Sequence, residues 1–171
     1  TLDSRLRGND KKEENSPFYK QLIPKHVLSF SYEETREFLR IYFGKIEEEK
    51  AMAFYELTGG LPFYLQFIGR ATKFEGDFET IVKNFITQEG NLFFIEEFNK
   101  LSGKEKLIVV ALSSGVNSLT EIAKKLGEPS TLVSRYLPDL TEKEVVAKVE
   151  RGKYKLVDNL FGLWIKERQG H

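Results

Sequence analysis

The spacing of apolar residues predicts a helical bundle in the first half of the chain. Ser31 and Glu34 form a capping box, and the apolar residues that follow recur at helical spacing, which predicts a helix over 32–43. The same spacing predicts further helices over 47–57, 62–74 and 77–88. The helix over 62–74 is apolar on nearly every face, which is typical of a buried helix.

A tight corner is predicted where two of these helices meet, in the stretch ELTGGLPFYLQFIG at residues 56–69. Gly59 can end a helix in the left-handed conformation, and Pro62 fits the first turn of the next helix, where its missing N–H costs nothing. Two interpretations of this bare corner stay open. It is either capping chemistry alone, or a place where glycine also lets the backbone approach a ligand.

The second half of the chain has the element order of a winged helix-turn-helix. Capping boxes at Ser102 with Glu105 and at Ser118 with Glu121 predict helices over 103–113 and 119–126. A third helix is predicted over 130–143. The β-rich runs VVAKVE (145–150) and KYKLV (153–157) flank the turn Arg151-Gly152 and predict a hairpin, which completes the order helix, helix, helix, hairpin.

The expected fold class is therefore mainly α with a small β-hairpin: a helical, ATPase-lid-like bundle followed by a winged helix. The aromatic-rich segment FFIEEFNKL (93–101) is expected to form a connecting helix whose rings belong to the core.

Composition narrows the class of protein. The 171 residues are 40% hydrophobic and 30% charged and include no cysteine, which excludes disulfides and thiolate metal sites. No apolar run is long enough to cross a membrane and no signal peptide opens the chain, so we expect a soluble protein in the cytoplasm, without a membrane partner. Residues 1–100 carry 14 Lys and Arg against 17 Asp and Glu, whereas residues 101–171 carry 12 against 9, so the second half is the basic one.

The predicted winged helix offers candidate DNA contacts on two surfaces. The helix over 130–143 presents outward the residues Ser130, Thr131, Ser134 and Arg135, of which only Arg135 is a strong reader of base edges. Pro138 is expected to interrupt the hydrogen-bond ladder of this helix, and Asp139 to oppose phosphate binding. Basic residues that could neutralise phosphates lie on or beside the hairpin and on the preceding helix: Arg151, Lys153, Lys155, Lys124 and Lys125.

Residues 17–166 resemble the archaeal-type AAA+ ATPases, in which a nucleotide-binding core is followed by a helical lid and a winged helix. The resemblance rests on SPFYKQ, LSFSYEETREFL, ELTGGLPFYLQFIG, LSGKEKLIVVALSSG, EIAKKLG and YKLVDNLFGLW. In such ATPases the proline of the lid corner lies against the adenine of the nucleotide. The resemblance therefore implies that Gly60, Leu61 and Pro62 would face the adenine of ATP in a complete family member, whereas this chain alone would hold no cofactor.

The sequence contains no Gly-x-x-x-x-Gly-Lys-Ser/Thr segment and no strand that ends in a paired acidic motif, so we expect no ATP hydrolysis by this chain alone. By resemblance it is the C-terminal part of such an ATPase. We expect residues 1–16 to be a tail, in which DSRLRGND resembles a translated repetitive DNA element and thus a fusion scar. The remaining divisions are a remnant strand and linker over 17–30, a four-helix lid over 31–98 and a winged helix over 99–171.

Loss of a nucleotide-binding core would leave two surfaces uncovered, the lid face around Pro62 and Phe63 and the strand KHVLSF at 25–30. We therefore expect self-association, for example as a homodimer, unless the tail covers these surfaces.

Two other classes of function compete with DNA binding. A protein-interaction module is favoured mildly by the zero net charge and by the acidic run Glu47-Glu48-Glu49. An enzyme in its own right is the weakest alternative, because neither His26 nor His171 lies near a candidate nucleophile or metal cluster. We expect no catalytic residue and no metal ligand in this chain.

Overall fold

A computed structural model describes residues 29–75 and 78–170 of the chain. Over these residues the protein is mainly helical, with one small antiparallel sheet. The helices are α1 (Tyr32–Phe43), α2 (Glu48–Thr58), α3 (Pro62–Glu75), α4 (Phe78–Thr87), α5 (Asn91–Asn99), α6 (Gly103–Ser113), α7 (Leu119–Leu126), α8 (Ser130–Glu142) and α9 (Asn159–Gln169), and the strands are β1 (Val146–Glu150) and β2 (Lys153–Leu156). The expected fold class, a helical bundle followed by a winged-helix-like end, is confirmed.

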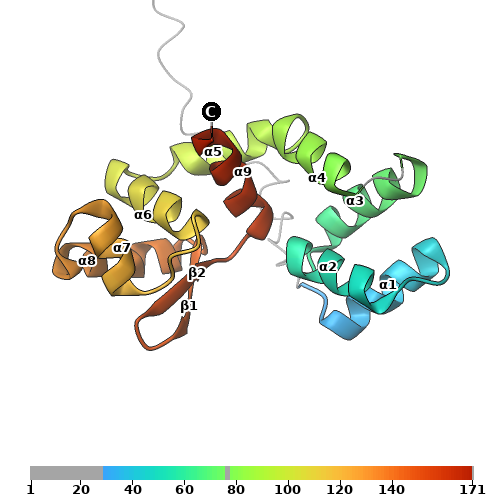
Figure 1. The fold of residues 1–171 in the computed structure, drawn as a ribbon, viewed down its shortest axis with the longest axis horizontal. Coiled ribbons are helices and arrows are strands. Elements are labelled where there is room, and N and C mark those ends of the chain that lie inside the picture. Colours follow the sequence, from blue (N-terminus) through green and yellow to red (C-terminus); the bar gives the residue numbers. More distant parts are fainter. Residues whose placement is uncertain (1–28, 76–77, 171) are drawn as a thin grey trace, which may run out of the picture.

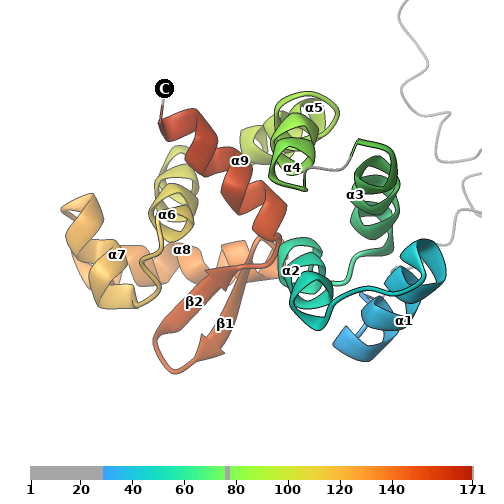
Figure 2. The same ribbon diagram turned by 45° about the vertical axis from the view of Figure 1, so that its right-hand side comes forward.

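Helices α1 to α5 form the helical bundle, and α6, α7, α8 and the β1–β2 hairpin form the winged-helix-like end. Figures 1 and 2 show α1, α2 and α3 at one end of the molecule and α6, α7, α8 and the hairpin at the other, with α5 and α9 between them. The three capping boxes found in the sequence, at Ser31, Ser102 and Ser118, are all present, so α1, α6 and α7 begin and end where the pattern predicts.

Aromatic rings build much of the bundle core. Phe54 is fully buried and packs against Phe43 and Phe78, with ring centroids 5.8 and 4.7 Å away. Leu65 and Ile68 on α3 are also fully buried, but Phe63 at the start of this helix is 67% exposed. The prediction that α3 is buried on nearly every face is therefore wrong at Phe63, because the neighbouring helices α1, α2 and α4 leave that part of its first turn uncovered.

The hairpin is anchored at both ends. Val146 pairs with Leu156, and both are buried against the aliphatic core that α6, α7 and α8 provide. At the other end, the N–H of Leu119 donates to the carbonyl of Gly152 at 2.9 Å, which joins the turn to the start of α7. The hairpin thus has a fixed position relative to α7 and α8.

Helix α9 was not predicted from the sequence. It packs against α6 on one side and against α2, α4 and α5 on others, so it lies between the bundle and the winged-helix-like end (Figure 2). Leu160, Phe161, Trp164 and Ile165 are all buried, which is a wider apolar surface than a single stripe. The division at residue 99 stays a prediction, and α9 contacts elements on both sides of it.

Helix α8 continues through Pro138, as the predicted helix over 130–143 implies. The helix runs from Ser130 to Glu142 and contains Pro138 on its exposed side. Proline removes one N–H donor, whereas Leu137 and Leu140 on the opposite side are buried and hold the helix against the core.

Candidate functional site

The corner between α2 and α3 is built as the sequence predicts. Gly59 ends α2 in the left-handed conformation (φ 59°), with its N–H donating to the carbonyl of Tyr55, and α3 begins at Pro62. The buried hydroxyl of Thr58 donates to the carbonyl of Phe54 at 2.7 Å and accepts from the N–H of Gly60. These contacts make the corner rigid without any ligand.

Gly60 is required by the chain itself. Its φ is +71°, and a Cβ at this position would lie 2.1 Å from the carbonyl oxygen of Phe30. The N–H of Phe30 in turn donates to the carbonyl of Gly60 at 2.8 Å. The close backbone approach that glycine allows here is therefore made to Phe30, and capping and packing account for both glycines.

Leu61 and Pro62 differ from Gly60 because they are only half-buried. Of the three residues that the resemblance places against an adenine, these two keep apolar surface open to a ligand. An adenine contact at Leu61 and Pro62 stays a prediction. Residues 1–28, which include most of the expected strand at 25–30, lie outside the described residues.

An apolar pocket of about 250 Å³ lies next to this corner. Its exposed walls are Phe63 and Phe93, the latter 53% exposed, and the rings of Tyr64 and Phe85 are buried beneath them. Phe67, Glu89 and Gly90 complete the lining. The sequence placed the aromatics of 93–101 in the core, which holds for Phe94 but not for Phe93.

The outward face of α8 carries the predicted polar residues. Ser130, Thr131, Ser134 and Arg135 are all exposed, and the buried residues Val133, Leu137 and Leu140 lie on the opposite side of the helix. The first turn of α8 has no side-chain cap, because Pro129 occupies the N-cap position. Arg135 therefore remains the only strong base-reading side chain on this face, as the sequence suggests.

The basic residues predicted on the hairpin, Arg151, Lys153 and Lys155, are all exposed. Arg151 lies in the turn, and Lys153 begins β2 beside it, where its Nζ lies 2.6 Å from a carboxylate oxygen of Glu150. Lys155 shares the outer face of β2 with Lys153 but lies nearer α9, in a cleft that Asn159 and Lys166 also line.

Basic residues also lie on β1 and on α7. Lys148 on β1 is exposed and pairs with Tyr154 across the hairpin, so it lies on the opposite face to Lys153 and Lys155. Lys148 is not among the DNA contacts predicted from the sequence, although its alternating position in a predicted strand could have identified it. The start of α7 contacts the hairpin turn, but Lys124 and Lys125 lie in the last turn of this helix, at its other end. Lys125 donates to the hydroxyl of Ser114.

Internal ion pairs fix the helices beneath this surface. Glu105 is 2% exposed; its carboxylate caps α6 through the N–H of Ser102 and lies 2.6 Å from the Nζ of Lys143, just after α8. Burial opposes ionisation of Glu105, but hydrogen bonds from Lys143 and Ser102 outweigh it and hold the pKa of this carboxyl below its ordinary value. Hydrogen bonds from Ser118 likewise lower the pKa of Glu121 on α7, and nearby Lys153 adds to this effect.

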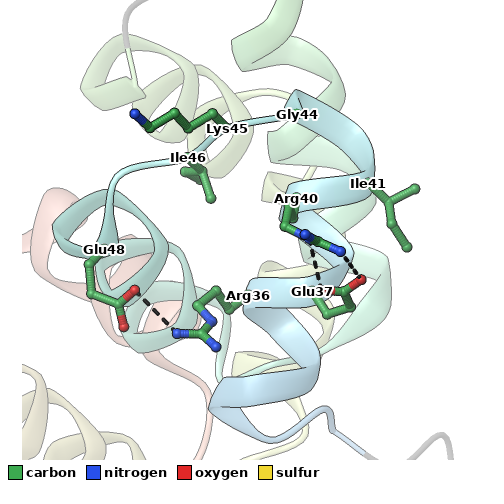
Figure 3. Close-up of a pocket in the computed structure, with 8 residues that line it drawn as sticks. All are labelled: Arg36, Glu37, Arg40, Ile41, Gly44, Lys45, Ile46 and Glu48. Atoms are coloured by element: carbon green, nitrogen blue, oxygen red, sulfur yellow. Dashed lines mark hydrogen bonds and ion pairs between the residues drawn. The ribbon is translucent and has the colours of Figure 1, made fainter.

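A shallow cleft of about 800 Å³ between α1 and α2 contains both basic and acidic side chains. Figure 3 shows Arg36 directed toward Glu48 and Arg40 toward Glu37, with N–O distances of 3.5 and 3.0 Å. Both arginines are thus paired with neighbouring carboxylates, and Lys45 is the third basic residue of the lining. Within residues 29–75 and 78–170, no three His, Asp or Glu side chains are grouped so as to hold a metal ion, and no helix is long and apolar enough to span a membrane.

Comparisons with known proteins find similarity at the level of structure. No protein-family model and no curated protein sequence matches this chain. Among solved structures, it is similar to the Walker-type ATPase of Pyrococcus abyssi, with a TM-score of 0.66 and 22% sequence identity over 81% of this chain and 42% of that one. The chain therefore spans less than half the length of that ATPase, and at this identity the similarity establishes a shared fold alone.

Proposed function

We propose that the winged-helix-like end binds duplex DNA, and that the whole chain corresponds to the lid and winged-helix part of an archaeal-type, Walker-type ATPase. The observation that carries the DNA proposal is the exposure of Arg151 and Lys153 at the tip of a hairpin that is fixed against α7 and α8. Basic side chains held in a fixed position are suited to phosphate contact, which supplies most of the affinity for DNA.

Sequence selectivity is expected to be low. The exposed face of α8 offers three hydroxyls and only Arg135 as a strong reader of base edges. Asp139 on the same helix is exposed and acidic, and Lys153 must exchange its contact with Glu150 for a phosphate. Affinity should therefore come from the DNA backbone and depend strongly on salt concentration.

The nucleotide part of the proposal rests on the corner. The shared fold with a Walker-type ATPase and the half-buried apolar surface of Leu61 and Pro62 support a contact to the adenine of ATP. A phosphate-binding Gly-x-x-x-x-Gly-Lys-Ser/Thr segment is not among the 171 residues, so we do not propose hydrolysis by this chain alone.

The test is fluorescence anisotropy of a short labelled duplex, titrated with this protein at low and at physiological salt. The double variant Arg151→Ala with Lys153→Ala should weaken binding to all sequences alike and reduce the slope of log K against log salt by about 1 per lost phosphate contact. Lys45→Ala with Lys50→Ala removes the same charge from exposed positions of the bundle and should leave binding unchanged. Equal affinity of the hairpin variant and the control would exclude the hairpin as the DNA contact.

A protein-interaction module is the second candidate, and the aromatic pocket beside the corner favours it. Phe63 is 67% exposed and Phe93 is 53% exposed, which is unusual for two phenylalanines that line one pocket. If the chain shows no DNA binding at low salt but forms concentration-dependent dimers that Phe63→Ser abolishes, this second function replaces the first. Sedimentation velocity over micromolar concentrations measures the dimer.

A further inference from the structure

Two consecutive residues, Asp158 and Asn159, contact both helices that meet at the corner. The hydroxyl of Tyr64, in the first turn of α3, donates to Oδ2 of Asp158 at 2.6 Å. The side-chain amide of Asn159 donates to the carbonyl of Glu56, in the last turn of α2. The corner at 59–62 is thus held on either side by one dipeptide that lies about a hundred residues later in the sequence.

The same dipeptide is joined directly to the hairpin. Val157, the residue before it, donates its N–H to the carbonyl of Val145 at 3.0 Å and so extends the pairing of β1 with β2. Asp158 also caps α9, since its Oδ1 accepts from the N–H of Phe161 at 3.0 Å. Asp158 thus contacts α3 and the first turn of α9 through its side chain, and it follows directly on the base of the hairpin.

The contact with Tyr64 is shielded from water. Tyr64 is 5% exposed, and burial followed by the nearby Asp158 charge raises the pKa of its hydroxyl far above the ordinary value. Burial also raises the pKa of Asp158, against the effect of the hydrogen bond from Tyr64. Water does not readily replace a hydrogen bond in such surroundings, so the geometry of the pair is well defined.

The corner determines how α2 and α3 are oriented. Gly59 and Gly60 both have positive φ, and the angle between α2 and α3 depends on these two residues. Because α2 and α3 each contact the dipeptide separately, any change in that angle must either break one contact or move the dipeptide.

We propose that Asp158 and Asn159 couple the corner to the hairpin, so that a ligand contacting Leu61 and Pro62 changes the DNA affinity of the hairpin. The proposal rests on the proposed function for its two ligands, whereas the coupling itself rests on the contacts above. Tyr64, Asp158 and Asn159 are then positioning residues, which touch neither ligand. Coupling of this kind is reciprocal, so DNA binding would in turn alter nucleotide affinity at the corner.

The first experiment measures the coupling without any ligand. Gly59→Ala disturbs the corner by placing a side chain at φ 59°, where no neighbouring atom lies within 4 Å, so the protein should still fold. Amide hydrogen exchange at Tyr154 and Val157 is measured relative to Leu137 and Leu140 in α8, so that a uniform loss of stability cancels. Gly59→Ala should change the hairpin rates about fivefold or more in the intact chain and leave them unchanged when Tyr64→Phe and Asn159→Ala are also present.

Lys83→Ala is the matched control. The Nζ of Lys83 on α4 lies 3.1 Å from a carboxylate oxygen of Glu167, at the other end of α9, and the substitution removes this contact. Coupling should survive this substitution. The proposal is wrong if Gly59→Ala has the same effect on the hairpin with and without the two contacts, if it has no effect in either case, or if Lys83→Ala removes the coupling equally well.

The second experiment repeats the DNA titration with Tyr64→Phe and Asn159→Ala together, since neither residue lies at the hairpin tip with Arg151 and Lys153. A change in affinity of about fivefold or more, absent in Lys83→Ala, is expected. If the intact chain binds no DNA while the exchange coupling is present, the DNA part of the proposed function is wrong and the coupling stands. If the intact chain binds DNA and the double variant binds equally well, the pair does not position the hairpin for DNA.

Discussion

The bundle and the winged-helix-like end are held together by different kinds of interaction. In the bundle, aromatic rings from different helices meet, as with Phe85 on α4, which packs against Tyr64 and Phe67 on α3 and Phe94 on α5. In the winged-helix-like end, the core is aliphatic, with Ile108, Ile122 and Leu140 among its fully buried members, and the helices are fixed by caps and ion pairs.

Capping boxes and aromatic clusters differ in the sequence range over which they act. A capping box depends on residues three positions apart, so it determines a helix start before any tertiary contact forms. An aromatic cluster contributes only when the distant helices are already in place. The bundle should therefore be more sensitive to core truncation, and the winged-helix-like end to loss of its charged contacts.

The largest effect is expected for Phe94→Ala. Phe94 is fully buried, and its ring centroid lies 6.2 Å from that of Phe85 in the bundle and 6.0 Å from that of Trp164 in α9. Truncation should lower the free energy of unfolding by about 3–5 kcal/mol. Urea denaturation followed by circular dichroism measures it, and the exposed neighbour Phe93→Ala is the control. Equal losses for the two variants would contradict the aromatic core described above.

The corner gives the next largest effect, through a pair of glycines. Gly59→Ala meets no atom and should cost about 1–2 kcal/mol, the strain of positive φ in a residue with a Cβ. Gly60→Ala bears the same strain and must also displace the carbonyl of Phe30, which would lie 2.1 Å from the new Cβ. Gly60→Ala should therefore be clearly the less stable variant in thermal unfolding. If the two glycines tolerate alanine equally, the pairing of Phe30 with Gly60 contributes nothing.

The winged-helix-like end is tested at Glu105. Glu105→Gln should lower the free energy of unfolding by about 1–3 kcal/mol at neutral pH, since it removes a buried charged partner of Lys143 and Ser102. The folded-state pKa is lowered, so this contribution is present above the ordinary value of about 4.3 and is lost as the pH falls through the lowered pKa. The difference between wild type and variant should therefore shrink in acid, as measured by urea titrations at pH 7 and below pH ~4. A pH-independent difference would contradict the assignment.

The same local and non-local distinction explains what the sequence predicts. Helices α1, α6 and α7 are predicted to the residue because each starts at a capping box. Helix α9 is missed because its buried residues face several neighbours and show no single stripe, although Asp158 three residues before Phe161 was a usable cap signal. Of the candidate sites, the exposed residues of α8 and the hairpin follow from periodicity. The contact of Tyr64 with Asp158 spans 94 residues, and no local pattern indicates it.

The smallest effect is expected at Asp158, which makes both a local and a long-range contact. Its side chain caps α9 and also accepts a hydrogen bond from Tyr64, 94 residues away. Burial is the main cause that raises the folded-state pKa of Asp158. The contribution of this carboxyl to folding stability is therefore complete when the pH is below the ordinary pKa of about 3.9, and it is lost as the pH rises through the raised pKa. At pH 7 the buried carboxylate is therefore a cost that Asp158→Asn removes while keeping an oxygen to cap Phe161.

We expect Asp158→Asn to change the free energy of unfolding by less than about 1 kcal/mol at pH 7. The stability of this variant relative to wild type should be higher at pH 7 than at pH 4. Asp158→Ala should lose about 1 kcal/mol relative to Asp158→Asn, because the cap is gone and the buried Tyr64 hydroxyl loses its acceptor. Urea titrations of the three proteins at both pH values measure this order. If Asp158→Asn and Asp158→Ala are equally stable, the side chain neither caps α9 nor holds Tyr64, and the connection between bundle and hairpin must lie in the apolar contacts of α9.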